Sequence, residues 1–597
     1  MADGNIPLGD REYAAVLARK ALEKQLITDG ILDDEKLERA RAEALRTGTS
    51  LLEVIPLLGY APPEAVYRSL AAYCKLPFVQ PSKMDIPETV IKNVPARFAT
   101  HYGFVPIQEK NGGYVVAVSD PLNAQLLDDI RLVLKKRIEP VVTTPEEIER
   151  ATKTLYGLGA DTVERILSEQ DSVASLLSLD TQQIGSDLGD ENIDASIIKF
   201  VNEVLMEAIQ SAATDIHIEP FEDQLRVRYR IDGILHQVPT PATIRGFQSA
   251  IVSRIKIMAN MNIAEKRLPQ DGKIPVSLGD GQYDLRVSVL PTAYGETVNI
   301  RILSRTSMFL TLDQLGFLPD DLRQFNAFLE KPHGIILVTG PTGSGKTTTL
   351  YASLSKLNKV DRKVITIEDP IEYQLKGITQ MQVQPRIGFD FSMGLRSMLR
   401  HDPDIMMVGE IRDFETAEMA IRSSLTGHLV FSTLHTNDAA GAVTRLVDMG
   451  VEPFLIASTM IASIAQRLVR CVCAQCAEPY QPDPAALREF GVPLKGMETA
   501  TFRRGRGCDV CRHTGYRGRI AIYEILTFTP AIKEMTYHRS PSTEIKRKGR
   551  EQGMRTLRES GWQQVCLGRT TLEEVMRVTS DADVLDAIET GDASVQV

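Results

Sequence analysis

The sequence lacks any run of about 18 apolar residues, the length that a helix needs to cross a bilayer. Its N-terminal stretch, MADGNIPLGDREYAAVLARK, also lacks the apolar segment typical of a secretory signal. We therefore expect a cytoplasmic protein with neither a transmembrane helix nor a secretory signal. An excess of positive charge is missing too, because the formal net charge is −10, and this argues against a protein whose main task is non-specific nucleic-acid binding.

Cysteine is scarce and unevenly placed, with seven residues in 597 and five of them between 471 and 511. In a reducing compartment, clustered cysteines indicate a metal site rather than a disulfide. Apolar residues make up 43% and charged residues 24%, which is typical of a folded globular chain. A chain of this length exceeds one hydrophobic core, so we expect three or more domains.

Changes of pattern along the chain predict five regions. The segment 157–192 carries eight acidic residues and one basic residue, Arg165, which favours a flexible linker. A cysteine-bearing insert at 471–515 and a helical C-terminal tail belong to the last region. The predicted regions are an N-terminal tail and helix at 1–24, a small mixed domain at 25–156, the acidic linker at 157–192, an α+β domain at 193–312 and an α/β nucleotide-binding domain at 313–597.

The stretch GIILVTGPTGSGKTTTLYASL contains the complete pattern G-x-x-x-x-G-K-[ST]. An apolar run at 335–339 precedes it, as expected of a buried strand, and a helical pattern follows from Lys346. Glycines let backbone N–H groups surround phosphate, Lys346 reaches the β/γ-phosphates of ATP, and the Thr347 hydroxyl is a ligand for Mg²⁺. The predicted nucleotide-binding residues are Gly340, Pro341, Thr342, Gly343, Ser344, Gly345, Lys346, Thr347 and Thr348.

Hydrolysis also needs carboxylates, and two follow apolar strands downstream of this loop. Glu368 comes after the run 364–367, and Glu410 follows the run 405–408, so both lie at the ends where ligands bind in open α/β sheets. Glu410 suits water-mediated contact with Mg²⁺ and Glu368 suits a general base or water orientation, but the sequence allows the two roles to be exchanged. His428 and His435 flank the strand LVFSTL and are predicted hydrogen-bond relays near the γ-phosphate.

Four motifs in order resemble those of the GspE/PilB secretion-superfamily ATPases: GPTGSGKTTTL its Walker A, ITIEDPIEY its aspartate box, DPDIMMVGEIRD its Walker B and LTGHLVFSTLHTNDA its histidine box. The resemblance covers roughly 193–580. It implies a RecA-like P-loop ATPase core preceded by an α+β (PAS-like) domain and a small mixed N-terminal domain. It also implies a hexamer that hydrolyses ATP with Mg²⁺, on the inner face of the inner membrane, to assemble pseudopilins in type II secretion or pilins in type IV pilus extension.

In that family, arginines of the domain before the core reach the bound phosphates. Here Arg226, Arg228 and Arg230 are spaced by two, which places them on one face of a strand. Such a basic stripe requires anions or acidic partners, and this favours Arg228 and Arg230 as the phosphate-reaching pair. Further candidates are Arg267, Arg286 and Arg301.

The cysteines Cys473, Cys476, Cys508 and Cys511 form two C-x-x-C pairs, a spacing that suits a structural, tetrahedral zinc site. Cys471 creates an additional C-x-C and could replace Cys473 as a ligand. The resemblance supports Cys473, since the family's first knuckle follows a Q-R-L-x-R-x segment, here QRLVRCVC. The same resemblance tells against a retraction-type motor, which usually lacks this cluster.

The region 25–156 resembles the N-terminal domain of the same ATPases, some of which bind cyclic di-GMP through paired R-L-G-x-x-L-x-x-x-G stretches. The two candidate stretches here are QLITDGILDDEKLERA and TGTSLLEVIPLLGYAPPEAVYRSLAAY. Both lack the leading Arg-Leu-Gly, which argues against that ligand and favours a docking domain. The implied partners are an inner-membrane platform protein and the cytoplasmic domain of a membrane-anchoring protein, with no specific nucleic acid. Two alternatives remain: a ring ATPase for DNA uptake or transfer, and a nucleotide-dependent regulator that does not hydrolyse ATP.

Overall fold

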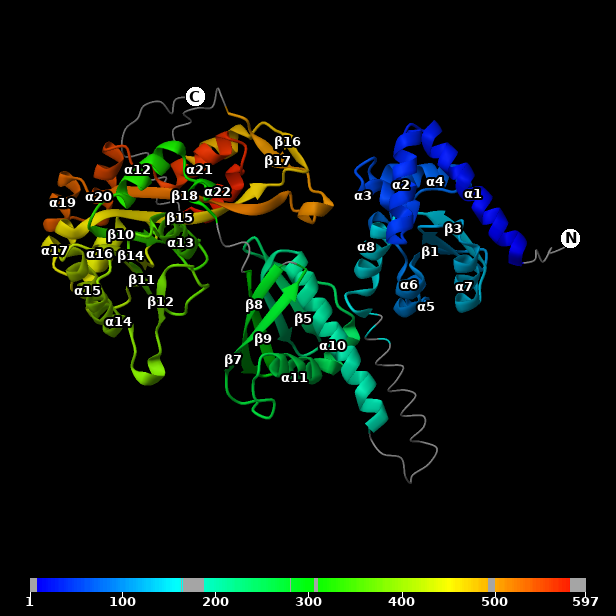
Figure 1. Ribbon diagram of the computed structural model, residues 1–597, viewed down its shortest axis with the longest axis horizontal. Coiled ribbons are helices and arrows are strands. Elements are labelled where there is room, and N and C mark those ends of the chain that lie inside the picture. Colours follow the sequence, from blue (N-terminus) through cyan, green and yellow to red (C-terminus); the bar gives the residue numbers. More distant parts are fainter. Residues whose placement is uncertain are drawn as a thin grey trace. The chain divides into compact units, whose positions relative to one another are not determined.

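Two units of structure make up the chain (Figure 1). The computed structural model describes residues 8–160, 162, 164, 187–279, 281–304, 310–491 and 500–579. One unit comprises Met1–Leu278 with Asp284–Ile302, and the other comprises Gly279–Tyr283 with Leu303–Val597. Most of the predicted acidic linker lies outside the described residues. Among those described, no helix is both long enough and apolar enough to cross a membrane.

A bundle of four helices opens the described part of the first unit. Asp33 and Ser50 accept hydrogen bonds from backbone N–H groups and so begin the second and third helices, while Pro63 begins the fourth. Their apolar sides bury a cluster that includes Leu26 and Leu70. The helices are α1 (Leu8–Thr28), α2 (Asp34–Thr47), α3 (Leu51–Leu57) and α4 (Pro63–Cys74).

A three-stranded sheet follows, with β1 (Phe104–Lys110) and β2 (Gly113–Val118) antiparallel and β3 (Ile138–Val142) parallel to β2. Every residue of β2 is buried, because this strand lies between β1 and β3 and helices pack against the sheet. The helices of this part are α5 (Glu88–Asn93), α6 (Ala96–Tyr102), α7 (Ala124–Leu134) and α8 (Pro145–Tyr156).

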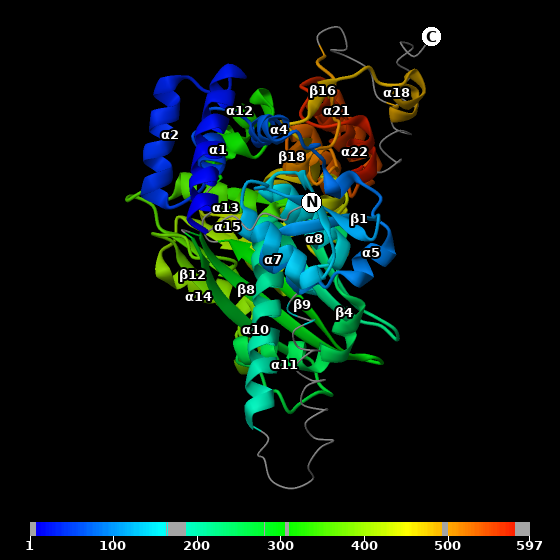
Figure 2. The ribbon, with the colours of Figure 1, turned by 90° about the vertical axis from the view of Figure 1, so that its right-hand side faces the viewer.

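The first unit also contains a six-stranded sheet with the order β6-β5-β4-β9-β8-β7. Burial alternates along β4 and β5, so one face packs and the other is polar. The helices α10 (Asp187–Gln210) and α11 (Gln248–Met258) cover the packed face (Figure 2), where Tyr229 donates to the Val204 carbonyl at 2.9 Å. The strands are β4 (Ala213–Pro220), β5 (Leu225–Ile231), β6 (Ile234–Val238), β7 (Gln270–Leu278), β8 (Gly281–Thr292) and β9 (Gly295–Ser304).

The second unit is built on a seven-stranded sheet with the order β12-β11-β13-β14-β10-β15-β18. Its neighbouring strands are parallel except β15 and β18, which are antiparallel. The apolar runs predicted as strands are confirmed, and the residues of β10, β11, β13 and β14 are all buried. The strands are β10 (Gly334–Thr339), β11 (Val364–Glu368), β12 (Thr379–Gln382), β13 (Ile405–Val408), β14 (Leu429–Leu434), β15 (Met460–Val472) and β18 (Tyr516–Thr527).

Two hydrophobic clusters lie on opposite faces of this sheet, because successive strand residues point to opposite sides. α12 (Pro319–Leu329) and α13 (Lys346–Leu357) contribute to one cluster. The other cluster includes residues of α14 (Phe391–Met398), α15 (Phe414–Leu425), α16 (Gly441–Asp448) and α17 (Pro453–Thr459), together with residues of the helices nearer the C-terminus. Helices on both faces of a mainly parallel sheet confirm the predicted α/β fold class.

The segment between β15 and β18 forms the predicted insert, with β16 (Ala477–Pro479) antiparallel to β17 (Arg503–Gly505). Trp562 of the C-terminal helices packs against Phe490 and Phe502, so the tail and the insert share a core. The remaining α-helices are α18 (Pro484–Phe490), α19 (Pro530–Tyr537), α20 (Ser542–Glu551), α21 (Leu557–Cys566) and α22 (Leu572–Val578). The short 3₁₀ helices are η1 (Pro81–Lys83), η2 (Ala242–Phe247), η3 (Leu312–Gln314), η4 (Pro385–Ile387), η5 (Leu399–His401) and η7 (Asp509–Cys511).

Candidate nucleotide site and cysteine cluster

The glycine-rich loop connects the buried strand β10 to α13, which begins at Lys346. Gly343 and Gly345 have φ values of 80° and 86°, a backbone conformation that side chains other than glycine rarely adopt. The Ser344 Oγ is buried and has no hydrogen-bond partner among the described residues. A phosphate oxygen would satisfy it, so the loop fits a bound nucleotide at the amino end of a helix.

Lys346 turns its ammonium group back onto this loop, where Nζ donates to the carbonyls of Gly340 at 2.7 Å and Pro341 at 3.1 Å. Burial lowers the pKa of Lys346 to about 8, although the nearby Glu410 carboxylate opposes that shift. A partly desolvated cation beside unsatisfied donors is a strong partner for phosphate.

Glu410 and His435 meet at the carboxyl edge of the sheet, as the sequence predicts from their places after β13 and β14. The His435 Nε2 lies 3.3 Å from the Glu410 Oε2, and Arg412 forms an ion pair with the other oxygen of the same carboxylate. Glu410 is also close enough to Lys346 to influence its pKa. Three neighbouring strands, β13, β14 and β10, therefore bring one carboxylate, one imidazole and one ammonium group to the phosphate loop.

Glu368, at the end of β11, has a different environment, since it is only 3% exposed. Its carboxylate accepts from Thr366 at 2.5 Å, from Gln380 at 3.1 Å and from the Tyr351 hydroxyl. Burial raises the pKa of Glu368, and the hydrogen bonds from Thr366, Tyr351 and Gln380 oppose this. The three donors hold this carboxylate in place, and the charge of Glu372, in the same ITIEDPIEY motif, also acts on it.

His428 is not part of this arrangement. It precedes β14, whereas His435 follows the strand, so the two lie at opposite ends and are separated by about 20 Å at the strand's rise per residue. The His428 Nδ1 is 2.7 Å from the Ser423 carbonyl and 3.1 Å from the Thr426 Oγ1. Within one subunit, the structure thus does not bring His428 to the phosphate loop, and the pair of relays predicted from the sequence reduces to His435.

Two further side chains support the loop from β15, and the sequence analysis did not select them. Gln466 donates to the Ser344 carbonyl at 2.9 Å and accepts from Thr349 at 2.8 Å, so it fixes the loop to the first turn of α13. Arg467 donates to the Asn437 carbonyl at 2.9 Å, and its charge also lowers the pKa of Lys346. Their signal in the sequence is the Q-R pair of QRLVRCVC, which was used only to place the cysteines.

The arginine stripe of β5 lies on the polar face of the six-stranded sheet, where carboxylates of β4 face it. Arg228 makes two hydrogen bonds to Glu219, at 2.9 and 2.7 Å. The Arg230 Nε lies 3.7 Å from an oxygen of Asp215, which also accepts from Arg301 at 3.3 Å. Arg228 and Arg230 therefore have acidic partners within their own sheet. Arg226 instead lies over the Phe221 ring at 4.5 Å, and its Nε has no hydrogen-bond partner among the described residues.

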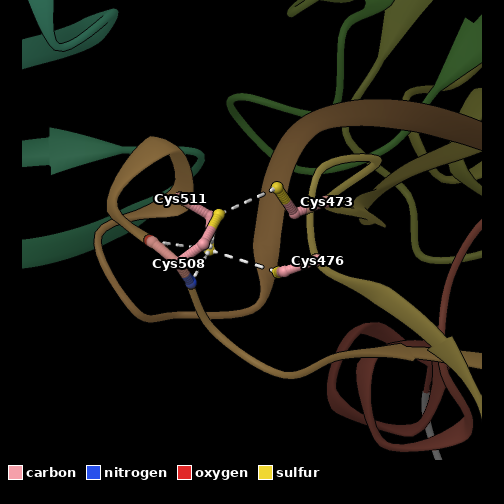
Figure 3. Close-up of side chains that lie close together, drawn as sticks. All are labelled: Cys473, Cys476, Cys508 and Cys511. Carbon is pink, nitrogen blue, oxygen red and sulfur yellow. Dashed lines mark hydrogen bonds between the residues drawn. The ribbon is translucent and has the colours of Figure 1, made fainter. Parts of the chain in front are cut away.

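The sulfur atoms of Cys473, Cys476, Cys508 and Cys511 all lie within 4.8 Å of one another (Figure 3). The separations are 3.8 Å for the first and third, 3.8 Å for the second and fourth, and 3.7 Å for the last two. A tetrahedral zinc ion with Zn–S bonds of about 2.3 Å requires sulfur atoms about 3.8 Å apart. The four thiols fit a zinc ion, and Cys471 is not among the grouped residues.

Two parts of the chain match known protein families. Residues 190–577 match the family described as Type II/IV secretion system protein, and residues 74–162 match the MshEN domain. The solved structure of the ATPase DotB from Legionella pneumophila is 22% identical and covers 64% of this chain and 95% of that chain, with a TM-score of 0.47.

Two curated relatives extend over nearly the whole chain. The Type IV pilus assembly ATPase PilB of Myxococcus xanthus is 40% identical over 557 residues, 93% of this chain and 98% of that protein. The Type II secretion system protein E of Xanthomonas campestris is 43% identical over 555 residues, 92% of this chain and 97% of that protein. The chain belongs to the type II/IV secretion system protein family and is one of its ATPases.

Proposed function

We propose that the chain hydrolyses Mg·ATP as a ring of six identical subunits and so drives the assembly of a pseudopilin or pilin filament. The observation that carries this proposal is the convergence of Lys346, Glu410 and His435 on the phosphate loop. The names of the relatives, a pilus assembly ATPase and a type II secretion protein E, support the biological role.

Each group has a role in this proposal. Lys346 and the loop amides bind the β- and γ-phosphates, and the Thr347 hydroxyl holds Mg²⁺. With Mg²⁺ bound, Glu410 would hold a water molecule beside the ion, and His435, 3.3 Å from that carboxylate, would keep it aligned. Glu368 either accepts a proton from the attacking water or fixes the loop that does so; its three donors favour the second role.

The ring and its partners are further parts of the proposal. Arg228 and Arg230 of one subunit reach the ATP of the next, and to do so Arg228 must leave its fork with Glu219. The motion reaches a polytopic platform protein at the inner face of the inner membrane, and the N-terminal region docks a membrane-anchoring partner. The cysteine cluster holds Zn²⁺ in a structural role because four thiolates leave no position for substrate.

The test measures phosphate release and subunit assembly together. We expect Lys346→Ala to lose activity by about 10²-fold or more, since it removes a preorganised cation that contacts the transferring phosphate. Lys356→Ala, in the same helix but bonded to Asn326 at 2.7 Å, is the matched control and should retain activity. Equal phosphate release by wild type and Lys346→Ala would contradict the proposal, as would activity that does not depend on assembly.

Stimulation by a second component separates the biological roles. A platform protein's cytoplasmic domain should raise the rate of phosphate release if the chain assembles filaments. Stimulation by DNA that falls steeply with salt would instead indicate a motor for DNA transfer.

A further inference from the structure

The cysteine-bearing insert carries a dense group of exposed arginines. Between 503 and 519 there are six arginines and one acidic residue, Asp509, a formal charge of +5 in a chain whose net charge is −10. All six arginines are exposed. We call this group the arginine knob; its members are Arg503, Arg504, Arg506, Arg512, Arg517 and Arg519.

The fold holds the two arginine-bearing segments against each other. Gly505 and Gly515 pass so closely that a Cβ on Gly505 would lie 2.0 Å from the Gly515 carbonyl oxygen. Cys473 donates its N–H to the same Gly515 carbonyl at 2.9 Å, and Arg506 donates its N–H to the Cys476 carbonyl at 3.0 Å. Figure 1 shows β16 and β17 near one end of the long strands β15 and β18; Arg503 and Arg504 lie in β17, and Arg517 and Arg519 lie at the start of β18. The cysteine cluster therefore fixes the backbone that carries the charges.

The charges of the whole insert must be counted with the knob. Between 471 and 519 there are eight basic and five acidic residues, a formal charge of +3, and a zinc ion with four thiolates adds −2, so a small positive excess remains. Arg504 forms an ion pair with Glu478 at 3.0 Å. In the part of the chain that the structure describes, Arg503, Arg506 and Arg517 form no ion pair.

We propose that the arginine knob binds a segment of a partner protein that carries clustered carboxylates. The knob contains no lysine, and arginine is the basic residue that is enriched at protein interfaces, whereas lysine is depleted there. The guanidinium group also binds a carboxylate through two parallel hydrogen bonds, which an ammonium group cannot do. A rigid backbone adds to this, because less ordering is needed on binding.

Nucleic acid is a poorer fit to this surface. Binding to single strands relies on exposed aromatic rings for base stacking. The phenyl and phenol rings beside the knob have partners within the chain: Phe502 packs on Trp562, Arg470 lies over the Tyr516 ring at 4.1 Å, and Arg504 lies over the Tyr480 ring at 5.9 Å. Val510, 46% exposed in the second knuckle, instead adds an apolar contact within the charged rim, as protein interfaces have.

The experiment measures binding of a fluorescein-labelled peptide of ten glutamates to the full-length, zinc-loaded protein without nucleotide, by fluorescence anisotropy. The test variant is Arg503→Glu/Arg506→Glu/Arg517→Glu. We expect its Kd to rise about tenfold or more at low salt, since three attractive charges become repulsive. The control Arg39→Glu/Arg46→Glu/Arg323→Glu changes the net charge equally at exposed sites and should alter Kd less than twofold.

A second variant, Arg503→Lys/Arg506→Lys/Arg517→Lys, keeps the charge and the fold but removes the forked donors. We expect a Kd raised several-fold, between wild type and the glutamate variant. Equal losses in the test and control variants would overturn the proposal, because bulk charge alone would then explain binding. So would knob-dependent binding to anionic vesicles or duplex DNA with no binding of the peptide. The measurement is independent of hydrolysis, so it can fail or succeed separately from the proposed motor function.

Discussion

Charged residues lie both at the carboxyl edge of the seven-stranded sheet and on the polar face of the six-stranded sheet. The two regions differ in the hydrogen-bond and ion-pair partners of these residues. At the edge, Lys346 bonds only to its own loop and Ser344 has a buried hydroxyl without a partner among the described residues. On the polar face, Arg228 is matched by Glu219, and Arg230 by Asp215. Both regions keep a buried donor without a partner among the described residues, Ser344 Oγ at the edge and Arg226 Nε on the polar face. The edge differs because its cation, Lys346, has no carboxylate partner at ion-pair distance in the described part of the chain, whereas matched ion pairs such as those of Arg228 and Arg230 also occur on ordinary surfaces.

A buried ion cluster formed by Lys546, Glu524 and Asp438 lies in the same unit as the carboxyl edge. Removing its cation should cause the largest loss of unfolding free energy. The Lys546 Nζ lies 3.8 Å from Glu524, which is fully buried, and 3.9 Å from Asp438. Lys546→Met leaves these carboxylates without their cation, so we expect the unfolding free energy to fall by about 3–5 kcal/mol. Trp562, the single tryptophan, is buried in α21 and reports this unit in guanidinium titrations.

Lys548→Met in the same helix is the matched control, because its ion pair with Glu551 is exposed and worth about 1 kcal/mol or less. If both variants shift the Trp562 transition equally, the buried cluster does not support the edge.

Glu410→Gln should have the largest effect on catalysis. It removes the charge beside Lys346, which in the proposed function orients water on Mg²⁺, so we expect kcat to fall by about 10²–10³-fold with little change in KM for ATP. Glu418→Gln, whose carboxylate pairs with Arg422 on the surface of α15, is the control and should keep full activity. A kcat for Glu410→Gln within twofold of wild type would remove Glu410 from the mechanism.

Glu368→Gln separates the two carboxylates. Thr366 and Gln380 donate to one oxygen of Glu368 and Tyr351 donates to the other, so the amide nitrogen of Gln replaces one of these two acceptors and meets a group that already donates. We therefore expect a loss of about 1–3 kcal/mol in unfolding free energy. Glu410→Gln should leave the same Trp562 transition in place. An unchanged transition with abolished turnover would show instead that Glu368 is the group that activates water.

The difference between the two regions also explains how far the sequence could predict them. Parallel strands end at one edge, so the apolar runs followed by Glu410 and His435 indicate that these two side chains lie close together, whereas Glu368 bonds instead to Thr366, Tyr351 and Gln380. The pairing of Arg228 with Glu219 depends on the register of β4 against β5, which no local pattern specifies. His428 was misplaced because the length of β14 separates it from His435.

Contacts between residues far apart in the chain could not be predicted from the sequence either. Gln466 and Arg467 reach the phosphate loop only because β15 lies next to β10 in the sheet, more than a hundred residues later in the chain. The four cysteines, by contrast, could be grouped from their C-x-x-C spacing, since each pair forms one knuckle.

Lys346 should make ATP binding dependent on pH, because burial lowers its pKa to about 8. Below that pH the ammonium is charged, and above it the charge is lost, so KM for ATP should rise about tenfold for each pH unit above 8. Bound phosphates favour the charged form, and kcat should change less. Lys346→Arg keeps its charge throughout and should show a flat KM; the same rise in that variant would assign the titration to another group.

The smallest effect is expected on the polar face. The Arg228–Glu219 pair is partly exposed, with side-chain exposures of 28% and 22%, so Glu219→Gln should change stability by about 1 kcal/mol or less. If Arg228 leaves this fork to reach a neighbouring subunit's ATP, a weaker fork lowers the free energy of releasing Arg228 from Glu219. The KM for ATP should then fall up to about fivefold. Adding Arg228→Ala should abolish that gain. A KM that is identical in wild type and Glu219→Gln would mean that the fork stays closed through the cycle, which would make the stripe a structural element of its own sheet.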